Sequence, residues 1–240
     1  MVTELKTTHY HNDSDPLESV SRVPRSKEDA RTFYNRFSRW YDLLAEGSER
    51  RLRGVGLQLL AAQPGEIVAE LGFGTGRAVV ALAERVGPSG HVFGLDISPE
   101  MLMRAQSKVN RVGCTGQVTL ECGDAARLPY DNQQLDAVFM SFTLELFDTP
   151  DIPAVLAECR RVLKPGGRLV LVSMYAAQGT PSVMERLYLW GHSRFPRFVD
   201  CRPLPVGLIL LAEHWTAVQK QTLNTFGLPV MVVRATPPSS

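Results

Sequence analysis

One acid and three closely spaced glycines are the residues of this chain best suited to hold a charged small molecule. Glu70 ends an apolar run and is followed by Gly72, Gly74 and Gly76. Because glycine has no side chain, backbone N–H groups in such a loop can approach a ligand closely. Arg77 stands where the dinucleotide fingerprint G-x-G-x-x-G has its third glycine. An acid here repels a pyrophosphate and suits a positively charged ammonium group, although the glycines alone also fit an ordinary tight turn.

A strand and a helix must flank this loop. Residues 67–71 are apolar apart from Glu70 and predict a buried strand, and residues 78–83 predict the helix that follows the glycines. Residues 91–96 predict a second strand, and Asp96 ends it. A carboxylate at that point can accept hydrogen bonds from two vicinal hydroxyl groups, which suits a ribose.

The rest of the chain continues to alternate strands and helices. Further strands are predicted at residues 118–122, 134–141, 168–174, 216–225 and 228–234, with a helix at 152–163. This alternation predicts a Rossmann-like α/β fold, a seven-stranded and mostly parallel sheet with helices on both faces. The last strand should run antiparallel, beside the fifth. Ligands of such sheets bind beyond the carboxyl ends of the strands.

The acid and its glycines resemble the S-adenosylmethionine (SAM) site of class I methyltransferases. Two more segments resemble the ubiquinone/menaquinone biosynthesis C-methyltransferase family. They are residues 34–42, Tyr-Asn-Arg-Phe-Ser-Arg-Trp-Tyr-Asp, and residues 163–167, Leu-Lys-Pro-Gly-Gly. The resemblance runs from about residue 33 to the end and is strongest over residues 70–174. It implies the class I methyltransferase fold, SAM as cofactor, S-adenosylhomocysteine as product and methyl transfer as the activity.

The resemblance also implies a set of cofactor contacts. Asp124 and Ala125 follow the third strand, where the family binds adenine, although Asp124 alone would also fit a turn that caps its own loop. The cofactor-binding residues expected on this basis are Glu70, Gly72, Phe73, Gly74, Thr75, Gly76, Asp96, Ile97, Gly123, Asp124, Ala125 and Ser141.

Aromatic residues predict a chamber for the methyl acceptor. They come from the N-terminal segment, from the end of the fourth strand and from residues 175–203, which break the α/β alternation. The expected substrate residues are Tyr34, Tyr41, Phe142, Tyr188 and Trp190. A carbon nucleophile on a phenol-like ring needs help in losing a proton, and His192 and Glu145 are the catalytic candidates. A structural role is the alternative for His192, because a lone histidine in a loop is more often structural.

Composition limits the partners. A net charge of +1 over 240 residues gives no electrostatic basis for nucleic acid binding. The four cysteines form no C-x-x-C pair, which argues against a zinc site or a disulfide framework and fits a reducing compartment. We therefore expect a cytoplasmic protein with a small-molecule acceptor, no metal and at most peripheral membrane contact.

The chain divides into a tail and one domain. Residues 1–26 are polar and predict a flexible N-terminal tail. Residues 27–240 form the predicted methyltransferase domain. Residues 27–62 supply two N-terminal cap helices, at about residues 33–44 and 48–62, and residues 175–203 form an insertion that caps the substrate.

Two other functional classes remain open from the sequence. A non-catalytic, regulatory SAM-binding protein would keep the cofactor motifs and lack an acceptor pocket. A NAD(P)-dependent oxidoreductase would share the sheet and the acid of the second strand, but the glycine spacing and Glu70 oppose it. Transfer of a labelled methyl group from SAM distinguishes the classes.

Overall fold

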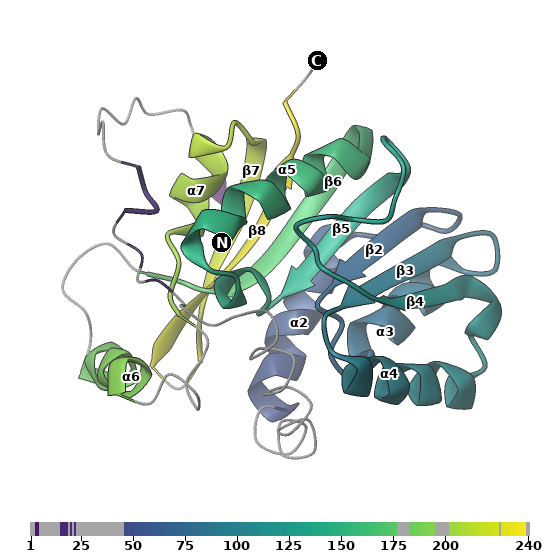
Figure 1. The fold of residues 1–240 in the computed structure, drawn as a ribbon, viewed down its shortest axis with the longest axis horizontal. Coiled ribbons are helices and arrows are strands. Elements are labelled where there is room, and N and C mark those ends of the chain that lie inside the picture. Colours follow the sequence, from purple (N-terminus) through teal and green to yellow (C-terminus); the bar gives the residue numbers. More distant parts are fainter. Residues whose placement is uncertain are drawn as a thin grey trace.

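The computed structural model describes residues 3–4, 15–18, 20, 22, 46–176, 183–194, 202–225 and 227–238. One twisted sheet runs through the molecule, with helices on both faces (Figure 1). The strand order is β1-β7-β8-β6-β5-β2-β3-β4. The strands span Thr3–Glu4 (β1), Ile67–Leu71 (β2), His91–Asp96 (β3), Val118–Cys122 (β4), Leu135–Ser141 (β5), Leu163–Met174 (β6), Thr216–Thr225 (β7) and Leu228–Thr236 (β8).

Strand directions agree with the sequence prediction. Strands β4, β3, β2, β5 and β6 are parallel neighbours, and β8 runs antiparallel between β6 and β7. The mostly parallel sheet and the antiparallel last strand beside the fifth predicted strand are therefore confirmed. The two-residue strand β1 adds an eighth member at the edge, where Thr3 and Glu4 pair with Lys220 and Gln219 of β7.

Side chains alternate along each strand and fill two cores. Val68 and Phe139 belong to the core under α2 (Glu46–Leu60), α3 (Arg77–Val86) and α4 (Pro99–Val112). Their neighbours Ala69 and Val138 belong to the opposite core, under α5 (Ile152–Val162) and α7 (Val206–Ala212). A strand that is buried on both faces has a nearly continuous apolar sequence, as residues 67–71 do apart from Glu70.

Local signals explain where the helices begin. The Oγ atom of Ser98 accepts a hydrogen bond from the Met101 N–H (3.2 Å), and Pro99 occupies the first turn of α4. Gly113 ends the same helix in the left-handed conformation. Gly76 precedes α3 with φ 75°. These caps place the amino ends of α3 and α4 beside the carboxyl ends of β2 and β3.

Element bounds differ from prediction by a few residues at several ends, and most at β6. β6 begins at Leu163 rather than 168, because Leu163 pairs with Leu135 of β5 before the register shifts. The second predicted helix ends at Leu60, where Ala61 turns the chain with φ 50°. The predicted helix around residues 33–44 lies outside the described residues.

Parts of the predicted N-terminal tail contact the domain. Besides the pairing of β1, Leu17 and Val20 pack against the core under α5. The Arg22 guanidinium donates to both carboxylate oxygens of Asp148, at 2.6 to 3.1 Å. The division into tail and domain itself stays a prediction. No helix among the described residues has the length and apolar character needed to cross a bilayer.

Candidate cofactor and methyl-transfer site

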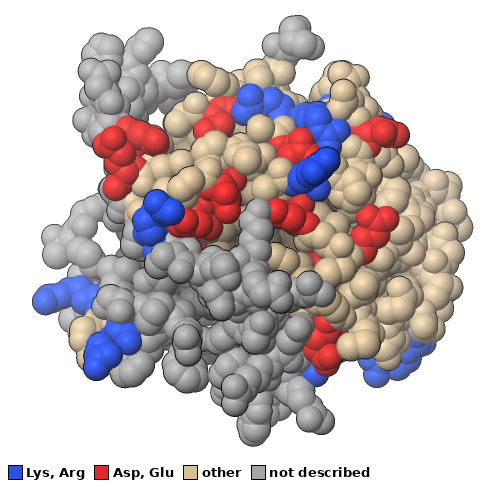
Figure 2. Space-filling view, viewed as in Figure 1, with Lys and Arg blue, Asp and Glu red and all other residues tan. Residues whose placement is uncertain are grey.

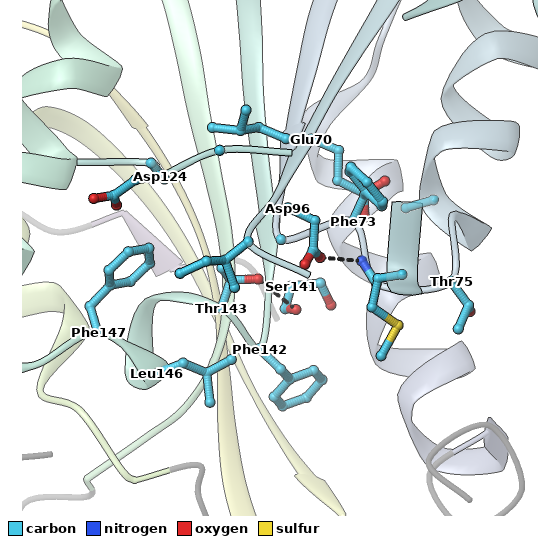
Figure 3. A pocket seen from close by; sticks show the side chains of 18 of the residues that line it. Glu70, Phe73, Thr75, Asp96, Asp124, Ser141, Phe142, Thr143, Leu146 and Phe147 are labelled. Carbon is cyan, nitrogen blue, oxygen red and sulfur yellow. Dashed lines mark hydrogen bonds between the residues drawn. The ribbon is translucent and has the colours of Figure 1, made fainter. Parts of the chain in front are cut away.

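A pocket opens at the carboxyl ends of β2, β3 and β5, where the glycine loop, α2 and the turns after β5 meet (Figure 3). All of the predicted cofactor residues except Gly76 line it. The lining residues are Glu49, Arg53, Glu70, Gly72, Phe73, Gly74, Thr75, Arg77, Ala78, Leu95, Asp96, Ile97, Met101, Gly123, Asp124, Ala125, Ser141, Phe142, Thr143, Leu146, Phe147, Asp148 and Asp151.

The glycine loop keeps side chains out of this pocket wall. Gly72 and Gly74 have φ of 71° and 51°, which glycine adopts without strain. A Cβ atom on Gly72 would lie 2.4 Å from Cγ2 of Thr143, so the close approach requires glycine there. Gly76 does not line the pocket but allows the loop to pack closely against α4. A Cβ atom on Gly76 would lie 2.8 Å from Cβ of Ala105 on that helix.

Glu70 is a buried acid at the edge of the pocket. Its Oε2 atom has no hydrogen-bond partner among the described residues. The pKa of Glu70 is raised to about 8, chiefly by burial and also by the Asp96 carboxylate, while the Arg53 guanidinium acts to lower it. A buried carboxylate oxygen without a hydrogen-bond partner needs a donor or a cation. The site therefore fits a ligand that brings an ammonium group.

Asp96 ties the glycine loop to the end of β3. Its Oδ2 atom accepts from the Gly74 N–H at 2.8 Å, drawn as a dashed line in Figure 3, and its Oδ1 atom accepts from the Ser98 N–H at 2.9 Å. Burial raises the pKa of Asp96, while these backbone N–H groups lower it. The Ile97 N–H also lowers the pKa of Asp96. An ionised carboxylate has about four acceptor positions, so acceptor capacity remains for a ligand hydroxyl beyond these three N–H groups.

Asp124 caps its own turn and also lines the pocket. Its Oδ1 atom accepts from the Ala126 N–H at 3.0 Å and its carbonyl from the Arg127 N–H at 3.0 Å, so it caps its own turn. Asp124, Gly123 and Ala125 also line the pocket. The turn role therefore does not exclude a ligand contact.

The chain after β5 gives the pocket an apolar wall. Phe142, Leu146 and Phe147 lie on it, with Thr143 between them and the glycine loop (Figure 3). Phe142 has φ 54°, a strained value for a bulky residue, and its N–H donates to the Val172 carbonyl at 2.7 Å. Strain of this kind concentrates at functional sites.

Several predicted acceptor and catalytic residues lie elsewhere. Glu145 does not line the pocket: it is fully buried, and its Oε1 atom accepts from the Met174 N–H at 3.1 Å. Tyr188 and Trp190 lie on α6 (Val183–Arg194) and do not line it either. Tyr188 is half-buried against the core under α2, whereas Trp190 is exposed, because α6 turns only one side toward the body of the protein. Tyr34, Tyr41 and the side chain of His192 are outside the described residues.

Sequence reasoning missed the contribution of α2. Glu49 and Arg53 of this helix reach the pocket, and burial lowers the pKa of Arg53. No local motif identifies them, because they meet Glu70 only through tertiary packing. Asp148 and Asp151 were also missed, although their position after the carboxyl end of a parallel strand was a usable signal.

The described residues contain no group of three or more His, Cys, Asp or Glu side chains that could hold a metal ion. The pocket combines two buried acids, Glu70 and Asp96, with the glycine loop and an apolar wall.

This fold and pocket define a class I SAM-dependent methyltransferase. A family model described as a methyltransferase domain matches residues 68–167. The chain is 32% identical to a demethylmenaquinone methyltransferase of Lactobacillus johnsonii over 205 residues, 84% of this chain and 82% of the relative. It is 32% identical to a ubiquinone/menaquinone biosynthesis C-methyltransferase of Bordetella parapertussis over 180 residues, 70% of this chain and 68% of the relative. The chain belongs to this family of quinone-biosynthesis methyltransferases, and SAM is its cofactor.

A solved structure shows the same fold. The magnesium protoporphyrin IX methyltransferase of Synechocystis, with bound SAH, superposes with a TM-score of 0.69 at 22% identity. The match covers 89% of this chain and all of the other. The predicted methyltransferase fold is therefore confirmed. The oxidoreductase alternative is wrong, because the chain matches the methyltransferase domain model and the methyltransferase relatives.

Proposed function

We propose that this enzyme transfers the methyl group of SAM to a small, amphipathic acceptor with a quinol-like ring. The observation that carries the proposal is the apolar wall of Phe142, Leu146 and Phe147 in the same pocket as the buried acid Glu70. Apolar pockets with a few polar groups suit ring compounds of this size. The names of the two quinone-pathway relatives support the same acceptor class.

The cofactor is held along the strand ends in this proposal. The carboxylate of Glu70 takes the ammonium group of the methionine part, and the N–H groups of the glycine loop lie along that part. Arg53 stands near Glu70 and pairs with the methionine carboxylate. Asp96 accepts from the ribose hydroxyls, and Asp124 and Ala125 contact adenine. The remaining predicted residues, Phe73, Thr75, Ile97, Gly123 and Ser141, complete the cofactor wall.

Bound SAM supplies an activated methyl group with its own leaving group. The protein therefore contributes alignment and the exclusion of water. Phe142 and Leu146 lie where the acceptor ring would pack, and the strained backbone of Phe142 fixes that surface through its hydrogen bond to Val172.

Proton removal from the acceptor is assigned to His192, the remaining candidate of the two. Glu145 holds the turn after β5 to the end of β6 through its bond to the Met174 N–H, which is a positioning role. The cytoplasm is the proposed location, in keeping with the free thiols of Cys114, Cys122 and Cys159.

The test is methyl transfer from SAM to a demethylated menaquinol analogue with a short side chain, with the product identified by mass spectrometry. Phe142→Ala should raise the KM for the acceptor by about tenfold or more, the loss expected for one aromatic contact. SAM affinity should stay at its original value. Met103→Ala is the matched control, because Met103 is an exposed apolar residue on α4.

Two results would contradict the proposal. If the enzyme binds SAM and methylates no quinol analogue, the acceptor class is wrong, and a complete lack of transfer to cell extract favours the non-catalytic alternative. If Phe142→Ala leaves the acceptor KM unchanged, the apolar wall does not contact the acceptor.

A further inference from the structure

Helix α6 carries a stripe of exposed apolar side chains. Met184, Leu187 and Trp190 are 45%, 58% and 59% exposed. They follow one another at three-residue steps, and residues three apart lie on the same side of a helix. We call these three residues the α6 stripe. Its side chains are large, and one of them is a tryptophan.

The described charges beside the α6 stripe have one sign. Of the α6 side chains that the structure describes, the other exposed ones are Arg186 and Arg194. At 3.6 residues per turn, both arginines fall on the arc of the helix that carries Leu187 and Trp190. Among the described side chains of α6, Figure 2 shows Lys or Arg, and the side chain of Glu185 on the same helix lies outside the described residues. The exposed face of the helix therefore combines apolar and cationic groups.

The side of α6 that carries Met184 and Tyr188 holds the helix to the body of the protein. Tyr188 packs against the core under α2. A Cβ atom on Gly227, in the turn between β7 and β8, would lie 3.1 Å from Cβ of Met184, so the helix sits beside that turn. Met184 therefore lies at the inner edge of the α6 stripe, and Leu187 and Trp190 are directed outward.

The position of α6 relates it to the pocket. The helix follows the carboxyl end of β6 in the chain, and Figure 1 shows it beyond the end of the sheet toward which β5 points. The pocket opens at the carboxyl ends of the parallel strands. Both features therefore belong to the same end of the sheet.

Other exposed apolar residues lack this arrangement. Met103 and Val112 on α4 are nine positions apart, and Leu211 stands alone on α7. Single exposed apolar residues are ordinary on protein surfaces. A short helix with tryptophan, leucine and methionine beside arginines is the pattern of a segment that lies in a membrane interface.

We propose that α6 docks the enzyme on an anionic lipid surface. The α6 stripe enters the headgroup region, where Trp190 is favoured, and Arg186 and Arg194 extend to lipid phosphates. The proposal rests on the proposed function, because an amphipathic quinol acceptor dissolves in the bilayer and docking turns the pocket end of the sheet toward it. Three apolar side chains give weak, reversible attachment.

The test is sedimentation of the full chain with vesicles of phosphatidylglycerol and phosphatidylcholine in equal parts, and with vesicles of phosphatidylcholine alone. The full chain should bind the anionic vesicles more tightly. Leu187→Glu should lose about tenfold or more in affinity. Arg186→Gln should lose about fivefold on anionic vesicles and almost nothing on neutral ones. The matched control Met103→Glu, with 61% exposure on another helix, should bind normally.

Failure of docking and failure of the function give different results. Leu187→Glu should methylate a water-soluble short-chain quinol at the original rate in the absence of lipid. If the full chain binds vesicles through α6 yet methylates no quinol, the function is wrong and docking stands. Docking is overturned if neither vesicle is bound, or if Leu187→Glu and Met103→Glu bind equally. It is also overturned if Leu187→Glu only converts a dimer to a monomer in solution, which would assign the α6 stripe to a second copy.

Discussion

Ionisation of Glu70 should make SAM binding depend on pH. In the free enzyme burial raises the pKa of Glu70 to about 8, so its carboxyl group is mostly protonated at neutral pH. The groups that act on it are Asp96, whose charge raises the pKa, and Arg53 and Lys108, which lower it. Pairing with the ammonium group of SAM requires the ionised form. SAM binding below pH 8 should therefore release a proton from Glu70.

The expected change in SAM affinity with pH follows from the pKa of Glu70. Below the pKa, the fraction of ionised Glu70 rises almost tenfold per pH unit. With a pKa of about 8, SAM affinity should rise about 20-fold between pH 6 and pH 7.5. The comparison stays below pH 8, because a free α-amino group has a pKa of about 8 and SAM begins to lose its own ammonium proton there.

Calorimetry in two buffers with different ionisation enthalpies measures both quantities. The wild type should release about one proton per SAM at pH 6.5. Glu70→Gln keeps the shape of the side chain and removes its titration, so its SAM affinity should be weak and flat from pH 6 to pH 7.5. Affinity that is independent of pH in the wild type would refute the reasoning. If the SAM affinity of Glu70→Gln depended on pH as strongly as that of the wild type, the titrating group would be a residue other than Glu70.

Three further predictions concern the same wall of the pocket. In the absence of SAM, the free energy of unfolding should fall as pH rises from 4.5 to 8, by about 1.4 kcal/mol per unit, because the folded pKa of Glu70 exceeds the unfolded one. Urea unfolding of wild type and Glu70→Gln checks this, since the variant should lack the slope. Asp96→Ala should weaken SAM binding at least about tenfold by calorimetry, because each charge-assisted hydrogen bond contributes about 1.5–3 kcal/mol. Gly72→Ala should lower Tm and SAM affinity more than Gly113→Ala, because both have positive φ but only the Cβ on Gly72 meets Thr143; equal effects would show that strain alone acts.

The ends of the strands could be predicted from the sequence, because they depend on the order of apolar and polar residues within a short segment. An apolar run followed by a polar residue marks the end of a buried strand, and parallel strands bring their carboxyl ends to one edge. Glu70, Asp96 and Asp124 could therefore be placed together without a structure. The caps of α4, Ser98 and Gly113, are likewise local signals, and the helix begins where Ser98 predicts.

The contribution of α2 and the direction of the side chains after β5 could not be predicted in this way. Arg53 reaches Glu70 only because α2 packs across β5 and β6, far from the glycine loop in sequence. Glu145 follows the same strand end as Phe142, yet one is buried under the end of β6 and the other faces the pocket. The sequence alone determined the fold and the strand-end residues of the pocket, because periodicity and glycine conformation are properties of a short segment. Only the tertiary structure decided which sides of α2 and α6 face inward, because the rotation of a helix is set by everything packed against it.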